Sequence, residues 1–229
     1  MISFAVLAVL LGGIGAVLYI GKKNNQADWG HWLTNILDGL IRVYCRRYHR
    51  QNDQKIKIPQ SGPVILASNH ISGIDPFIII TATNRPIRFM IAQEEYQKPI
   101  LNWMFRAAGC IPVDRAGRVE KAFRSVIRAI QAGEVVAIFP QGGIHHTTTP
   151  REKIKPGIIK LSLLTLTPII PIRIWGIVAP GTITQAAIQR SQVEFETHCA
   201  ISADQVAHPD FAGEMSQWLI FSTHQIRLD

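Results

Sequence analysis

The stretch Ser68-Asn69-His70-Ile71-Ser72-Gly73-Ile74-Asp75-Pro76-Phe77 determines how the rest of this chain is interpreted. It follows a short apolar run at residues 63–67, which is typical of a buried strand. His70 therefore lies where a strand ends, and Asp75 follows it five positions later. An imidazole beside a carboxylate is the arrangement of a general base. Residues five apart do not share a helix face, so the pair can meet only if the chain turns, and Gly73 permits that turn.

The same residues also fit a purely structural role. Asp75-Pro76 is a good helix start, with aspartate as the N-cap and proline at the first helical position. A single histidine after a strand is more often structural than catalytic. Asp75 could serve as cap and as partner of His70, so the pattern by itself leaves both interpretations open.

The composition favours a membrane surface as the partner of this chain. The 229 residues carry a net charge of +8 but only 17% charged side chains, and the mean hydropathy is slightly positive. A basic, apolar protein suits an anionic membrane. Nucleic acid is not favoured, because no basic run interleaved with aromatic residues and no recognised binding motif is present. Three widely spaced cysteines indicate a reducing compartment and no disulfide framework.

The N-terminus predicts a membrane anchor over residues 1–24. Residues 2–20 form an apolar run without a charge, which is about the length that spans a bilayer. Lys22 and Lys23 follow the run, and a basic region before it is missing, so a cleaved signal peptide fits poorly. The positive-inside rule then predicts that the lysine pair and the rest of the chain face the cytoplasm. A segment embedded in one leaflet is the alternative.

Residues 25–58 are predicted to hold an amphipathic interfacial helix and a linker. Apolar residues recur at helical spacing from residue 29 to residue 44, and Arg42, Arg46, Arg47 and Arg50 gather towards the end. Aromatic and basic residues on one helix suit the membrane interface. An ordinary helix packed on the domain, with arginines at its C-terminus, explains the pattern equally well.

The remainder, residues 59–229, predicts an α/β fold with a mixed, mostly parallel sheet flanked by helices. Apolar runs alternate with segments of helical period, as parallel sheets with crossover helices require. The expected strands are 63–67, 87–92, 109–115, 135–139, 167–172 and 193–197. The expected helices are 98–107, 119–131, 158–166 and 211–227, and residues 77–82 continue as a helix or a strand.

Four segments, in this order, resemble the motifs of the glycerolipid acyltransferase family, which includes the lysophosphatidic acid acyltransferases. The first is Asn69-His70, four residues, then Asp75-Pro76, and the second is Gly109-Cys110-Ile111-Pro112-Val113-Asp114-Arg115. The third is Phe139-Pro140-Gln141-Gly142-Gly143-Ile144, and the fourth is the apolar stretch around Pro171. Together they cover residues 64–175.

The resemblance implies the roles of these residues. His70 would deprotonate a lipid hydroxyl and Asp75 would orient His70, while the hydroxyl oxygen attacks the thioester of acyl-CoA or acyl-carrier protein. Arg115 would bind the polar head of the lysolipid acceptor, lysophosphatidic acid, beside Pro140, Gln141, Gly142 and Gly143. Asn69 and Pro171 would support the motifs. The family needs no metal and no other cofactor, and the product would be phosphatidic acid on a membrane.

The third motif departs from the family's Phe-Pro-Glu-Gly-Thr-Arg. Gln141 replaces the glutamate, Gly143 the threonine and Ile144 the arginine. Nearby basic residues are candidate substitutes: His145, His146, Arg151, Lys153 and Lys155. A metal site at His145-His146 is not favoured, because adjacent histidines point apart and no third ligand is evident. The departure leaves two alternatives open: an unphosphorylated acceptor such as diacylglycerol or another lipid alcohol, or a non-catalytic lipid-binding protein.

Overall fold

The computed structural model describes residues 4–114, 117, 119–144 and 154–220, and within these ranges it contains one six-stranded sheet of order β3-β2-β4-β1-β5-β6. The strands are β1 (Val64–Ser68), β2 (Ile87–Ala92), β3 (Ile111–Val113), β4 (Val135–Ile138), β5 (Ile169–Trp175) and β6 (Glu194–Thr197). All pairs are parallel except β5 with β6, which is antiparallel. The predicted fold class, a mixed and mostly parallel sheet flanked by helices, is therefore confirmed.

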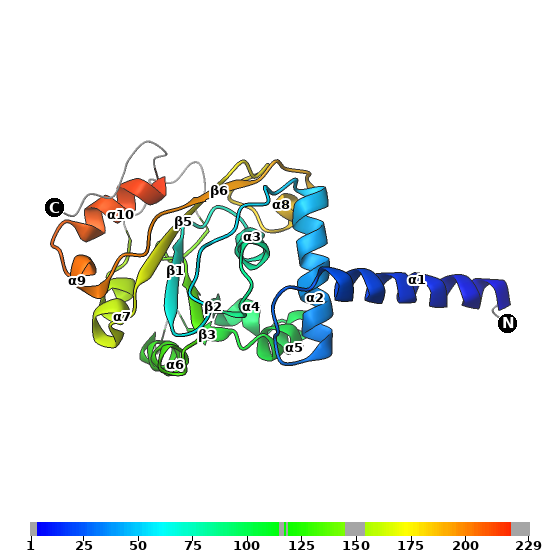
Figure 1. Ribbon diagram of the computed structural model, residues 1–229, viewed down its shortest axis with the longest axis horizontal. Helices are drawn as coiled ribbons and strands as arrows, with labels where there is room; N and C mark the ends of the chain where they lie inside the picture. The colour runs from blue at the N-terminus through cyan, green and yellow to red at the C-terminus, as the bar shows by residue number, and fades with distance from the viewer. Residues whose placement is uncertain (1–3, 115–116, 118, 145–153, 221–229) are drawn as a thin grey trace.

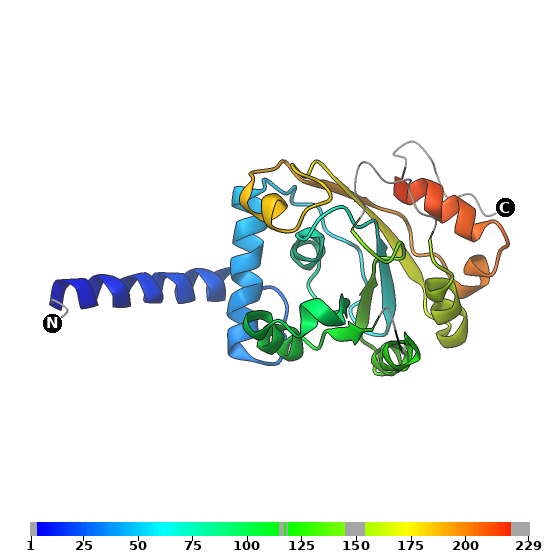
Figure 2. The same cartoon turned by 180° about the vertical axis from the view of Figure 1, so that it is seen from behind.

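Two apolar layers enclose the central strand β1. Val64 and Leu66 point into the core on one face, and Ile65 and Ala67 into the core on the other, as the alternation of side chains in a strand requires. All four are fully buried. The first face is covered by α3 (Asp75–Ala82), and the second by α6 (Val119–Gln131), α7 (Gly157–Thr165) and α10 (Phe211–Ile220). Figures 1 and 2 show the sheet between these helices.

The predicted elements agree with the structure most closely where the sequence carries a clear period. Strand β2 and helix α6 have the predicted bounds. Strand β5 begins two residues later than expected and runs on to Trp175, and α10 ends at Ile220, the last residue described there. Short helices that the sequence did not predict are α4 (Gln93–Tyr96), α8 (Thr184–Ile188) and α9 (Ala203–Val206), whereas α5 (Pro99–Ala107) was expected.

The N-terminal helix α1 (Phe4–Asn24) projects from the rest of the molecule (Figure 1). Its part from Val6 to Asn24 is long and apolar enough to cross a membrane, by length and composition. The end of α1 crosses α2 (Trp32–Val43) at close range, because a Cβ placed on Gly39 would lie 1.8 Å from the carbonyl oxygen of Gly21. Two glycines thus let the two backbones touch.

Helix α2 continues as a π-helical turn, η1 (Tyr44–Tyr48), and packs on the domain through α3. Arg42 lies in the last turn of α2, as the sequence pattern indicated, but it faces the protein interior and not the membrane interface. Arg42 is fully buried and binds Asp38 through two hydrogen bonds, of 2.6 and 2.9 Å, while its Nη1 also donates to the carbonyl oxygen of Thr81. This arginine fixes α2 to α3, because a buried guanidinium is stable only when it is paired and hydrogen-bonded.

Candidate functional site

The carboxylate of Asp75 is the fixed point of the site. It is fully buried, and its Oδ2 accepts hydrogen bonds from the backbone amides of Ile71 (2.7 Å) and Ser72 (2.9 Å). Its Oδ1 accepts one from the hydroxyl of Ser72 (2.7 Å). The prediction that Asp75 caps α3 is wrong, since Ile74 holds the N-cap position and Pro76 lies in the first turn. The side chain turns back to the loop that follows β1.

His70 is the group that this carboxylate orients. Its Nδ1 lies 2.8 Å from Oδ2 of Asp75, and only 15% of the side chain is exposed. A carboxylate at Nδ1 favours the tautomer that carries its proton there, which leaves Nε2 free to accept one. The imidazole also stacks on the ring of Phe139, the residue that follows β4, with centroids 4.0 Å apart and planes 15° from parallel. The ring is therefore held by a hydrogen bond at one edge and by an aromatic face.

The turn between His70 and Asp75 needs Gly73 for space. Gly73 does not adopt a positive φ, but a Cβ at this position would lie 2.8 Å from Cγ2 and 2.9 Å from Cα of Ile183. The amide of Gly73 donates to the carbonyl oxygen of Thr182 (3.1 Å). A glycine is therefore needed at this turn, as expected. It is needed because Ile183 leaves no room for a side chain, and not because the backbone adopts a positive φ.

Asn69 joins the histidine loop to the neighbouring strand. Its Nδ2 donates to the carbonyl oxygen of Ile174, and its Oδ1 accepts from the amide of the same residue, both at 2.8 Å. The side chain thus extends the pairing of β1 with β5 by one residue. Pro171 lies in β5 opposite Ala67 and is buried in the sheet. Asn69 and Pro171 thus both support the pairing of β1 with β5, at whose end His70 lies.

The third motif lies beside His70 at the end of β4. Gln141 is 6% exposed, and its Oε1 accepts a hydrogen bond of 3.2 Å from the backbone amide of His70. The amide of Gly142 donates to the carbonyl oxygen of Phe139 (2.9 Å), which closes a tight turn, and Gly142 has a φ of +87°. Gln141 therefore supplies an acceptor to the backbone of His70 without bringing a charge.

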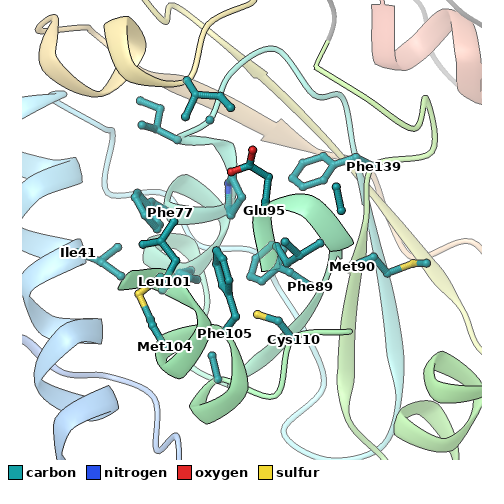
Figure 3. Close-up of a pocket in the computed structure, with 18 of the residues that line it drawn as sticks. Ile41, Phe77, Phe89, Met90, Glu95, Leu101, Met104, Phe105, Cys110 and Phe139 are labelled. Atoms are coloured by element: carbon teal, nitrogen blue, oxygen red, sulfur yellow. The ribbon is translucent and has the colours of Figure 1, made fainter. Parts of the chain in front are cut away.

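An apolar cavity of about 660 Å³ opens beside His70. It lies between α2, α3, β2 and α5, and Figure 3 shows Phe77, Leu101 and Phe105 among the side chains that point into it. Gly143 and Ile144 of the third motif also line it. The cavity is not lined by Pro140, Gln141, Gly142 or Pro171. The site thus joins a polar edge, formed by His70, to a mostly apolar wall.

Cys110 lines the same cavity, in surroundings that disfavour its thiolate form. Burial raises the pKa of its thiol to about 11, and a thiol is reactive only as the thiolate. Within the described ranges, no three His, Cys, Asp or Glu side chains are grouped as metal ligands.

The structure brings His70 together with Asp75 and with Gln141 of the third motif, and it places Asn69 against Ile174 of β5. Arg115, the predicted acceptor-binding residue, lies outside the described residues, and so do the histidines at 145 and 146. Sequence reasoning missed two contributors, Phe139 as a stacking partner and Ser72 as a hydrogen-bond donor. The signal for Ser72 was its place inside the first motif. Nothing in the sequence shows that β4 lies beside β1.

Comparisons with known proteins agree with this geometry. A family model described as "Acyltransferase" matches residues 49–175, more than half of the chain. A "Probable 1-acyl-sn-glycerol-3-phosphate acyltransferase" of Mycoplasma genitalium is 28% identical over 127 residues, which are 52% of this chain and 47% of that protein. An "N-acylphosphatidylethanolamine synthase" of Arabidopsis thaliana is 26% identical over 124 residues, 50% of this chain and 43% of that protein. The chain thus spans about half the length of these curated relatives.

Among solved structures, the 1-acyl-sn-glycerophosphate acyltransferase of Thermotoga maritima has the same fold. The TM-score is 0.58 at 19% identity, and the match covers 81% of this chain and 76% of that one. The histidine and aspartate of the first motif, in contact at the end of a central parallel strand, lie within the residues that the family model matches. The chain therefore belongs to the glycerolipid acyltransferase family.

Proposed function

We propose that this protein transfers a fatty acyl group from acyl-CoA or acyl-carrier protein to the hydroxyl of lysophosphatidic acid and forms phosphatidic acid. The observation that carries the proposal is the 2.8 Å contact between His70 Nδ1 and a buried Asp75, at the rim of an apolar cavity. The name of the Mycoplasma genitalium relative supports a lysophospholipid acceptor, whereas the Arabidopsis thaliana relative is named for a different product, N-acylphosphatidylethanolamine.

In this mechanism Nε2 of His70 accepts the proton of the acceptor hydroxyl while the oxygen attacks the thioester carbonyl. Asp75 stabilises the imidazolium that forms, since an ionised partner strengthens the hydrogen bond at Nδ1. When the tetrahedral intermediate collapses, the carbon–sulfur bond breaks, and the proton on His70 passes to the thiolate. The products are an ester and a thiol, and no acyl-enzyme is required.

The cavity suits the acyl chain of a substrate. Its walls are mostly aliphatic and aromatic, and Met104 and Phe105 of α5 are among the side chains that line it (Figure 3). A volume of about 660 Å³ is in the range of roughly 300–1,000 Å³ that binds small molecules. The depth of this space would then select the length of the chain.

We place the reaction at a membrane, with residues 1–24 as the anchor, residues 25–58 as the interfacial helix and linker, and residues 59–229 as the acyltransferase domain. The support is the exposed apolar surface of α1 and the lysines at its end, which predict a cytoplasmic catalytic domain. Trp32 on α2 is also 63% exposed, as an interfacial aromatic residue would be.

On the acceptor side, Arg115 and the segment from Pro140 to Gly143 would hold the head group. A second candidate is an acceptor without a phosphate, such as diacylglycerol or another lipid alcohol. One observation favours it: Ile144, in the place of the family's arginine, lines the cavity beside His70. A non-catalytic lipid-binding protein would not need the oriented imidazole.

An acceptor panel tests the proposal. The purified full chain, in vesicles with acyl-CoA or acyl-carrier protein, is offered lysophosphatidic acid, monoacylglycerol and diacylglycerol, and the acylated products are counted. We expect phosphatidic acid to form with the highest kcat/KM. Preference for a neutral acceptor would reject lysophosphatidic acid as the substrate and favour the second candidate, and no transfer to any acceptor would favour a binding protein.

A further inference from the structure

Lys155 lies against the third motif, on the segment that leads into α7. The structure fixes its backbone on both sides. The amide of Lys155 donates to the carbonyl oxygen of Pro140 (2.9 Å), and the amide of the buried Ile154 donates to the hydroxyl of Ser216 (3.2 Å). The backbone of Lys155 is therefore anchored to the loop that contacts His70, whereas the residue itself is exposed to solvent.

The side chain of Lys155 lies along Gly142. A Cβ on Gly142 would be 2.4 Å from Nζ, 2.9 Å from Cε and 3.3 Å from Cδ of the lysine. Gly142 follows Gln141, whose Oε1 binds the backbone of His70. The ammonium thus occupies space next to the motif because the glycine has no side chain there.

In the part of the chain that the structure describes, Lys155 forms no ion pair. The neighbouring position that holds a glutamate in the family's motif is Gln141, which carries no charge. An unpaired ammonium beside a neutral motif favours an anion, and phosphate is the anion that the proposed acceptor carries.

We infer that Lys155 binds the phosphate of the acceptor and takes over part of the role of the arginine that Ile144 replaces. This inference rests on the proposed function. It makes Lys155 a specificity-determining residue for the acceptor. The combination of Gln141, Ile144 and Lys155 would then be a rearranged phosphate site.

The test compares Lys155→Ala with Lys160→Ala, a matched control at an exposed lysine of α7. KM and kcat of the full chain are measured in vesicles for lysophosphatidic acid, for monoacylglycerol and for the acyl donor. Loss of a charge-assisted contact should raise KM for lysophosphatidic acid roughly 10- to 100-fold. KM for monoacylglycerol, KM for the donor and kcat should change little. Lys155→Arg should restore most of the affinity, and Lys160→Ala should behave as wild type.

The outcomes separate this inference from the function on which it rests. If wild type acylates lysophosphatidic acid and Lys155→Ala does so with unchanged KM, the inference is wrong and the proposed function stands. A rise in KM for the donor alone would also overturn it, because the lysine would then serve a phosphate of the donor. Wild-type protein that does not acylate lysophosphatidic acid at all would reject the proposed function itself.

Discussion

Asp75→Asn tests whether the charge of the buried carboxylate, beyond its shape, is needed for catalysis. Asparagine can keep most of the contacts, since its oxygen can accept from His70 and from the amides of Ile71 and Ser72, and its amide can donate to the Ser72 hydroxyl. The loop should therefore keep its conformation. What the variant loses is the negative charge that stabilises the imidazolium in the transition state.

The size of the loss follows from the geometry. Opposite charges 2.8 Å apart at an effective dielectric of about 20 attract each other by up to about 6 kcal/mol, and a neutral amide retains a fraction of this. General-base catalysis contributes about 10²–10⁴-fold, or roughly 3–5 kcal/mol at about 1.36 kcal/mol per tenfold. We therefore expect kcat to fall by about 10²–10⁴-fold, with little change in the acceptor's KM.

Ser72→Ala is the matched control for this experiment. It removes one hydrogen bond to Oδ1 of Asp75, and it leaves the contact of Oδ2 with His70 in place. Its stability should fall by about 1 kcal/mol, and its kcat by less than about tenfold. The assay is steady-state acyl transfer by the full chain, with thermal unfolding measured on the same samples. An Asp75→Asn variant that keeps more than a tenth of wild-type kcat would refute the reasoning. Equal losses in the two variants would show that the role of Asp75 is structural.

Three further predictions concern the acceptor, the stability and the membrane. Arg115→Ala should raise the KM for lysophosphatidic acid strongly and the KM for a neutral acceptor little. Arg115→Lys should recover only part of the lost affinity, because an ammonium cannot form the two-pronged contact with phosphate. An unchanged KM in Arg115→Ala would show that Arg115 does not bind the phosphate. Burial lowers the pKa of His49, so its neutral form is favoured in the folded protein. As the pH falls below about 6.5, the ordinary pKa of histidine, the unfolded chain binds the proton first, and the folded protein should lose stability. Thermal unfolding at pH 7 and pH 5 should show a smaller loss for His49→Gln than for wild type, and equal losses would contradict this. The full chain should stay with membranes in high salt and in alkaline carbonate; release by carbonate would contradict an integral anchor, and release by salt would favour interfacial binding through α2.

The sequence predicted the architecture because its apolar periods are clear. Helix α6 repeats apolar residues on one face and ends before Gly133, which has a positive φ, so its bounds were predictable. Strand β6 alternates as an edge strand does, and in the described residues it ends the strand order beside β5. The helices of four and five residues, α4, α8 and α9, are too short for a period to be visible.

The site was predictable only where it is local in sequence. His70 and Asp75 are five residues apart, and a turn was enough to bring them together. The stacking of Phe139 on His70 depends on the adjacency of β4 and β1, which is a property of the whole sheet. The burial of Arg42 was not predicted, because a basic residue near a helix end is usually solvated and its buried partner Asp38, one turn earlier, was not recognised.

The central claim is that His70 acts as the general base for acyl transfer. The most direct measurement is the kcat of His70→Ala, in the full chain and with the acceptor that wild type prefers, on samples shown by circular dichroism to be folded. The account predicts that acyl transfer falls by at least about 10²-fold, and that the KM values change little. Turnover close to wild type in a folded His70→Ala protein would contradict it.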